Sequence, residues 1–212
     1  MWNYSVKEGT DSPFEYVSGI NDIIIEPGVT SIGNEIFRRS TVENIQIPDS
    51  VTRIGKYAFF DCDYLTSICI PESVTDIGEA AFYDCDGLTS IEIPSGVTSI
   101  SSEAFSGCSS LESINVVKNN KNFSSENGVL FNKDKTKLIC CPAAKQGEYI
   151  VPNTVDQIGE EAFYNCRLLT KIIISEGVRE IGYSAFYNCS SLKSITIPNS
   201  LTNIDWCVFY DC

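Results

Sequence analysis

The chain has 212 residues and a formal net charge of −13, from 28 acidic and 15 basic side chains, and it contains no histidine. Such an acidic surface repels phosphate backbones and anionic lipid head groups, which argues against nucleic acid or an anionic membrane as a partner. No run of 18 apolar residues occurs, so the sequence predicts no membrane span.

Residues 1–19 do not follow the pattern of the rest of the chain. This segment carries Trp2, Tyr4, Phe14 and Tyr16, and we predict that it is an N-terminal cap, because the open end of a stack of coils exposes core and sheet edges. Its start lacks the basic and apolar regions of a signal peptide. The chain also ends partway through a repeat, at Cys212, so a shortened form of a longer protein is one expectation and a cytoplasmic protein is the alternative.

Residues 20–212 consist of units that begin with the motif Val-Thr-x-Ile-Gly. The leading residues, mostly 23 apart, are Val51, Val74, Val97, Val155, Val178 and Leu201, and a unit that is one residue shorter begins at Val29. In the unit from Val74 the apolar positions are Val74, Ile77, Ala81, Phe82, Leu88, Ile91 and Ile93. Burial of so few side chains cannot offset the entropy of ordering one unit, so the units are predicted to stack as a repeat solenoid.

Each unit is predicted to hold one short strand and one short helical turn. The apolar alternation before proline indicates strands around residues 23–25, 45–47, 68–70, 91–93, 114–116, 149–151, 172–174 and 195–197, which we expect to form one parallel sheet. The segment 79–83 and its equivalents have helical tendency. The residues that follow it are of types that tolerate a left-handed backbone: Asp61, Asp84, Gly107, Asn165, Asn188 and Asp211.

Six cysteines lie eleven residues after the leading residue of their unit: Cys62, Cys85, Cys108, Cys166, Cys189 and Cys212. We predict a buried structural column, in which each thiol is a small apolar group and a weak donor to turn carbonyls. Disulfides between neighbouring coils and a metal site are the alternatives. The adjacent Cys140 and Cys141 are expected to face opposite ways on a strand, which disfavours metal binding.

No catalytic residue and no cofactor are predicted, so we expect that the protein is not an enzyme. Without histidine, the commonest general base and the Ser-His and Cys-His nucleophile pairs are missing. Asp61 with Asp63 and Asp84 with Asp86 form carboxylate pairs. We interpret these pairs as solvated turn residues, with a weak calcium site between Asp61 and Asp84 as the alternative.

A longer spacer separates Val97 from Val155. The range 127–142 is predicted to form a protruding β-hairpin around the polar turn 132–136. The whole non-standard segment, 117–150, holds six lysines against Glu126, Asp134 and Glu148, a net charge of +3. Lys133 and Lys135 at the hairpin turn are therefore candidate contacts for an acidic partner or a second copy of the chain, although solvated turn lysines also explain the pattern.

Outward-pointing strand positions define the candidate binding face. From them we select Gln46, Ser90, Glu92, Ile150, Lys171, Ile173 and Thr196. Ile150 and Ile173 are predicted to form an apolar spot beside Lys171, and exposed apolar side chains on a sheet face are a modest signal for binding.

The pattern L-x-S-I-x-I-P-x-x-V-x-x-I-G-x-x-A-F-x-x-C resembles the BspA-like leucine-rich repeat family over about residues 20 to 212. The resemblance implies a right-handed solenoid with its parallel sheet on the concave face and short helical turns opposite. It also implies a cell-surface or secreted protein that takes part in adhesion. The expected partner is a protein or glycan, including a host surface or matrix, and the alternative is a passive spacer that displays another domain of a longer chain.

The sequence departs from this pattern in two units. In the unit from Val29, Arg38-Arg39-Ser40 replaces the turn and the cysteine, and in the last unit Asp205-Trp206-Cys207 replaces Gly-x-x.

Overall fold

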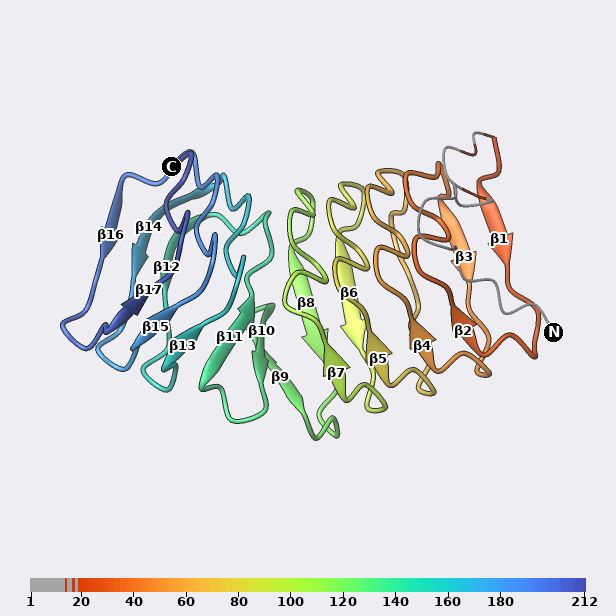
Figure 1. The fold of residues 1–212 in the computed structure, drawn as a ribbon, viewed down its shortest axis with the longest axis horizontal. Helices are drawn as coiled ribbons and strands as arrows, with labels where there is room; N and C mark the ends of the chain where they lie inside the picture. The colour runs from red at the N-terminus through yellow and green to blue at the C-terminus, as the bar shows by residue number, and fades with distance from the viewer. Residues whose placement is uncertain (1–13, 15–16, 18) are drawn as a thin grey trace.

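The computed structural model describes residues 14, 17 and 19–212, so most of the predicted cap at residues 1–19 lies outside the described residues. The described chain winds into a stack of coils, with the strands at 22–24 and 194–196 at opposite ends of the stack (Figure 1). The predicted repeat solenoid is confirmed.

The predicted strands form a first ladder on one side of the stack. Its strands are β1 (Asp22–Ile24), β3 (Asn44–Gln46), β6 (Ser90–Ile93), β8 (Ser113–Val116), β12 (Gly147–Ile150), β14 (Leu169–Ile173) and β16 (Ser194–Thr196). Pairing is parallel and in register, so that Ile91 lies beside Ile114 and Ile172 beside Ile195. The expected single sheet is interrupted, however, into β1-β3, β6-β8 and β12-β14-β16. Residues 68–70 form no strand, although Ile70 is buried and continues the core.

A second ladder, which the sequence analysis did not predict, arises from the Val-Thr-x-Ile-Gly motifs. One sheet contains β2 (Ser31–Ile32), β4 (Arg53–Ile54), β5 (Asp76–Ile77) and β7 (Ser99–Ile100). The other contains β9 (Phe123–Glu126), β10 (Val129–Asn132), β11 (Lys137–Cys140), β13 (Gln157–Ile158), β15 (Glu180–Ile181) and β17 (Asn203–Ile204). Most of these strands have two residues, which is too short for an apolar alternation to be visible in the sequence.

The turn segments are not helical. In the unit from Val74, both Ala80 (φ 49°) and Asp84 (φ 51°) are left-handed, which breaks a right-handed helix. The N–H of Phe82 instead donates to the carbonyl of Ala104 in the next coil, at 2.8 Å. The six residues predicted to be left-handed all have positive φ, which confirms that prediction: Asp61, Asp84, Gly107, Asn165, Asn188 and Asp211.

Phenylalanine rings stack along the core from coil to coil. Phe59 and Phe82 are fully buried, with ring centroids 5.2 Å apart and planes 4° from parallel. The core divides into two clusters. We call the coils from Val29 to Val116 the first block and those from Gly147 to Cys212 the second block.

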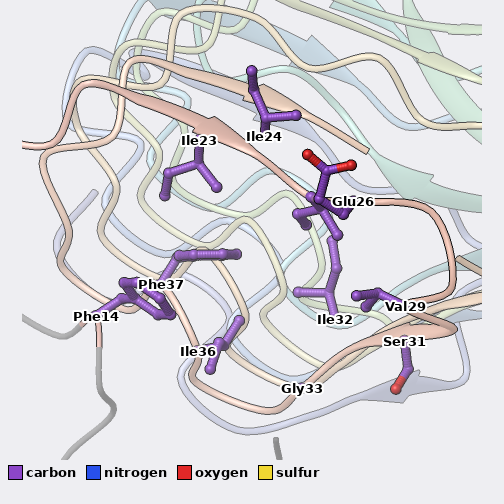
Figure 2. Close-up of a pocket in the computed structure, with 11 residues that line it drawn as sticks. Phe14, Ile23, Ile24, Glu26, Val29, Ser31, Ile32, Gly33, Ile36 and Phe37 are labelled. Carbon is purple, nitrogen blue, oxygen red and sulfur yellow. The ribbon is translucent and has the colours of Figure 1, made fainter. Parts of the chain in front are cut away.

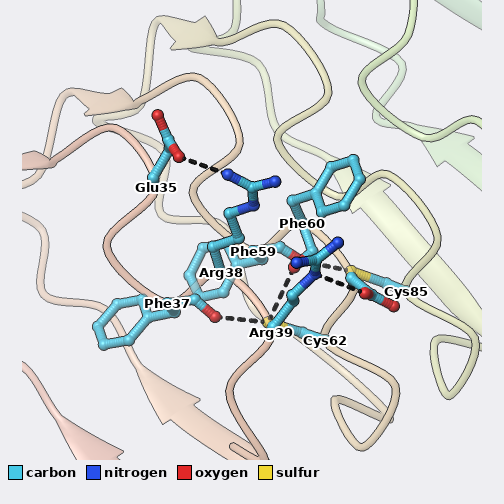
Figure 3. A network of polar contacts seen from close by, with 9 residues as sticks. Glu35, Phe37, Arg38, Arg39, Phe59, Phe60, Cys62 and Cys85 are labelled. Atoms are coloured by element: carbon cyan, nitrogen blue, oxygen red, sulfur yellow. Dashed lines mark hydrogen bonds and ion pairs between the residues drawn. The ribbon is translucent and has the colours of Figure 1, made fainter. Parts of the chain in front are cut away.

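The cysteine column is structural, as predicted. Cys62 and Cys85 are buried free thiols that donate to the carbonyls of Phe37 and Phe59 in the preceding coil, both at 2.9 Å (Figure 3). Burial is the largest effect on Cys62 and raises the pKa of its thiol to about 11. The thiol therefore stays protonated and remains a donor at neutral pH.

Thiol labelling checks this arrangement. The structure has ten free cysteines, of which only Cys69, Cys207 and Cys212 are exposed. We expect an aromatic disulfide reagent to react rapidly with these three in the native protein and with all ten after denaturation without reductant. Fewer than ten reactive thiols in the denatured chain would contradict the structure, because disulfides would then be present.

The predicted hairpin is a buried part of the solenoid, not a protrusion. β10 pairs antiparallel with both β9 and β11, and β11 pairs parallel with β13. Alternate side chains enter the two core clusters: Leu130 and Cys140 join the first, and Phe131 and Cys141 join the second. A sheet buried on both faces forms a wall between the two blocks, and the exposed residues of the hairpin lie at its turns, at Asn127, Lys133 and Asp134.

Candidate binding surface

Seven of the nine candidate residues lie on the outward face of the first ladder. They are Gln46 in β3, Ser90 and Glu92 in β6, Ile150 in β12, Lys171 and Ile173 in β14, and Thr196 in β16. Each alternates with an inward-pointing strand residue, because successive side chains on a strand point to opposite faces.

Four of these residues come together in the second block. Ile173 lies in register between Ile150 and Thr196, and Ile150 is 58% exposed. Beside them, Lys171 Nζ lies 3.1 Å from Glu148 Oε1, and this exposed ion pair balances the local charge. We call Glu148, Ile150, Lys171, Ile173 and Thr196 the second-block patch. It offers an apolar centre with a polar rim, which is the anatomy of a protein-binding surface.

The other three strand residues are not part of that patch. Gln46 lies beside Ile24 in the sheet β1-β3, and Ser90 and Glu92 lie beside Ser113 and Asn115 in β6-β8. No ladder hydrogen bonds join these sheets to β12-β14-β16 in the described part of the chain. The structure therefore brings four of the seven candidates together and leaves three in separate sheets.

Lys133 and Lys135 do not join the strand face. Their turn lies at the second ladder, where the N–H of Asp156 donates to the carbonyl of Thr136 at 2.8 Å. Lys135 Nζ is 2.5 Å from Glu126 Oε2, and Lys133 Nζ donates to the carbonyl of Asn120. Both ammonium groups thus have partners within the chain, which weakens the prediction of a basic contact for a partner.

The sequence analysis missed an apolar pocket at the N-terminal end of the described stack. It has a volume of about 450 Å³ and is lined by Phe14, Ile23, Ile32, Ile36 and Phe37, among others (Figure 2). Phe14 packs on Phe37 with ring centroids 5.3 Å apart and lies 23 residues before it, which is the repeat period. This spacing is a sequence signal that the pattern extends before residue 20.

The acidic turn residues form no metal site. Burial, followed by the neighbouring charges of Asp86 and Asp61, raises the pKa of Asp84 to about 6, so these carboxylates repel one another. Asp61 accepts from Arg39 at 3.1 Å. Within residues 14, 17 and 19–212, no group of three or more His, Cys, Asp or Glu side chains is placed to hold a metal ion. The same residues include no helix long and apolar enough to cross a membrane.

The geometry defines a repeat solenoid with two strand ladders and an exposed strand face. The model of the BspA type leucine rich repeat region matches residues 7–134 and 142–212 with six copies. The chain therefore belongs to the BspA-type leucine-rich repeat family, a family of bacterial surface-type proteins, which is consistent with protein binding. No curated protein gives a significant match.

Solved structures of bacterial leucine-rich repeat proteins are similar. A leucine-rich repeat protein from Eubacterium ventriosum is 33% identical over 87% of this chain and 56% of its own, with a TM-score of 0.75. The pneumococcal vaccine antigen PcpA is 27% identical over 85% and 51% of the two chains, with a TM-score of 0.72. A leucine rich cell surface protein from Faecalibacterium prausnitzii is 28% identical over 86% and 42%, with a TM-score of 0.64. The chain spans about half the length of these proteins.

Proposed function

We propose that this chain is the binding region of a cell-surface or secreted bacterial protein and that it attaches to a protein or glycan of a host surface or matrix. The second-block patch is the contact surface, and the interaction needs no catalysis and no cofactor. The observation that carries the proposal is the outward-facing apolar pair on the first ladder, where the exposed Ile150 lies in register with the partly buried Ile173.

The chemistry of the patch supports binding. Association gains most from apolar side chains that become desolvated at the centre of an interface. Here Ile150 and Ile173 supply that centre, while Lys171 and Glu148 neutralise one another across the strands. The similarity to a cell surface protein and to a vaccine antigen supports an extracellular location.

The variant Ile173→Asp tests the proposal. A carboxylate in the apolar centre must lose its water when a partner binds, which is costly without a counter-charge. We expect affinity for the partner to fall at least about tenfold, a loss of about 1.4 kcal/mol. The measurement is surface plasmon resonance against immobilised, purified matrix proteins and host glycans.

Leu168→Asp is the matched control, because Leu168 is 51% exposed but lies in the turn before β14. It should bind like the wild type. Binding by Ile173→Asp as strong as that of the control would contradict the second-block patch as the contact surface. No binding of the wild type to any matrix protein or glycan would favour the passive spacer, the alternative function.

A further inference from the structure

The ladders that link neighbouring coils are all interrupted between the first block and the second. In the first ladder, β8 does not pair with β12, and in the second ladder β7 does not pair with β9. At the turn segments, no backbone hydrogen bond among the described residues joins 101–108 to 159–166. The contact between these two turn segments, which we call the joint, is therefore held by side chains.

An aromatic side chain from the first block reaches across the joint. Tyr83 packs on Tyr164 of the second block with ring centroids 5.5 Å apart. Ser106 occupies the equivalent position in the coil between them, and its small side chain allows the two rings to meet. Asp84 also leans over this coil, since a Cβ on Gly107 would lie only 1.8 Å from Asp84 Oδ1.

Glu161 is buried at the joint without a counter-charge. The residue is 8% exposed, and its Oε2 atom is buried without a hydrogen-bond partner. Ser106, only 2% exposed, likewise has a buried hydroxyl that makes no hydrogen bond. The neighbouring Glu160, by contrast, is exposed and accepts from the Ser102 hydroxyl across the joint at 3.0 Å.

The groups that face Glu161 are acidic or neutral. They are Glu160 and Tyr164 from its own turn segment, Glu103 and Ser106 from 101–108, Tyr83 and Asp84 from 78–85, and Cys140 from β11. Burial, which is the largest effect, and the charges of Glu103, Asp84 and Glu160 together raise the pKa of Glu161 to about 7, even though the nearby Ser106 hydroxyl lowers it. Arg167 and Lys56 act on Asp84 and Glu103, so the nearest cations serve other carboxyl groups.

We propose that Glu161 is a proton-operated lock on the joint: when the carboxyl is protonated the two turn segments stay closed on one another, and loss of the proton opens them. A buried carboxylate without a cation is costly. Hydration relieves this cost when 101–108 and 159–166 separate locally. No backbone hydrogen bond joins the two segments directly, and the wall between the blocks stays bonded to both blocks, at the carbonyls of Leu111 and Ala162. The ladders within each block stay intact when the joint opens. Opening therefore changes how firmly the first-ladder faces of the two blocks are held relative to one another, and it unfolds neither block.

The direction of the pH effect follows from linkage. A carboxyl whose pKa is higher in the closed joint than its ordinary value of 4.5 binds a proton that the open joint releases. The closed joint is therefore most stable below about pH 4.5, loses stability as the pH rises to about 7, and changes little above that.

Hydrogen exchange at pH 5.5 and pH 8.0, corrected for the intrinsic exchange rate, tests the lock. In the wild-type protein we expect protection of 101–108 and 159–166 to fall about tenfold or more at the higher pH, while 182–189 changes little. Glu161→Gln should abolish most of this pH dependence, because the amide stays neutral, and Asp84, with its pKa raised to about 6, accounts for the remainder. Glu160→Gln, one residue away, should keep the wild-type pH dependence.

A carbon-13 NMR titration of the glutamate carboxyls provides a measurement that does not depend on a variant that folds. One carboxyl, assigned to Glu161 by sequential backbone connectivity, should titrate near pH 7. The proposal is overturned if that carboxyl titrates near 4.5, if wild-type protection of the joint does not depend on pH, or if Glu160→Gln abolishes the dependence as Glu161→Gln does.

Discussion

Replacing Phe82 by alanine is expected to lower the free energy of unfolding by about 3–5 kcal/mol. Phe82 is fully buried, and its ring stacks between Phe59 at 5.2 Å and Phe105 at 5.6 Å. A cavity at this position removes contacts with the coils on both sides, and a solenoid obtains its stability from such nearest-neighbour interfaces. Urea denaturation followed by circular dichroism measures the loss.

Phe209→Ala is the control for this prediction. Phe209 belongs to the same column, but it is 36% exposed and stacks only on Phe186, at 5.5 Å. Its removal should cost less than half as much as removal of Phe82. Equal losses for the two variants would show that stacking on both sides does not determine the contribution of a ring.

Much of the fold was predictable because the repeat dictates the same environment many times. One period positions the inward residues, the cysteine column and the left-handed turn residues, and the structure confirms all three. Cys85, for example, has the same type of carbonyl partner as Cys62, one coil earlier. A single unit says little about the fold on its own. A position that holds the same residue type in successive units, however, indicates a column of stacked side chains.

The features that the sequence analysis missed depend on contacts between one coil and the next. Two-residue strands such as β4 exist only because the next coil supplies hydrogen-bond partners. The turn segment 79–83 has residues with helical tendency, yet Ala80 is left-handed, and the carbonyls of Glu79 and Ala81 accept from backbone N–H groups of the preceding coil. Tertiary hydrogen bonds override local propensity here.

The candidate surface was predictable in part for a related reason. Strand alternation identifies which residues point outward, and Ile150 with Ile173 follows from it directly. Alternation does not reveal whether outward residues share one sheet, because that depends on where the ladders are interrupted. Lys133 was selected from charge alone, whereas its ammonium group binds the carbonyl of Asn120, a contact that leaves no pattern in the sequence.

One sequence signal does indicate where the second ladder ends. The glycine of Val-Thr-x-Ile-Gly is replaced by Ser101 in the unit from Val97 and by Asp205 in the last unit. β7 directly precedes Ser101, and β17 directly precedes Asp205. Each is the strand nearest the C-terminus in its sheet. A Cβ on Gly55, Gly78 or Gly182 would lie 2.7 Å from backbone atoms of the preceding coil, so glycine is retained where the second ladder continues to the next coil.

Gly78→Ala is expected to lower the free energy of unfolding by about 1–3 kcal/mol, because it forces a methyl group into a packed interface. A Cβ on Gly78 would lie 2.7 Å from the backbone carbon of Gly55 and 2.7 Å from the nitrogen of Lys56. Both atoms are backbone, so no side chain can move aside, and the spacing of the two coils must increase. That increase stretches the ladder hydrogen bond from the N–H of Gly78 to the carbonyl of Ile54, which is 2.9 Å long.

Ser101→Ala provides the matched comparison, because Ser101 occupies the equivalent position one coil later and already carries a Cβ. Loss of the Ser101 hydroxyl should change the free energy of unfolding by about 0.5 kcal/mol or less. Urea denaturation of both variants measures the difference. A tolerated Gly78→Ala would mean that a coil whose strand pairs on both sides can shift as freely as a coil at the end of its ladder, and the glycine pattern would then no longer indicate where a ladder ends.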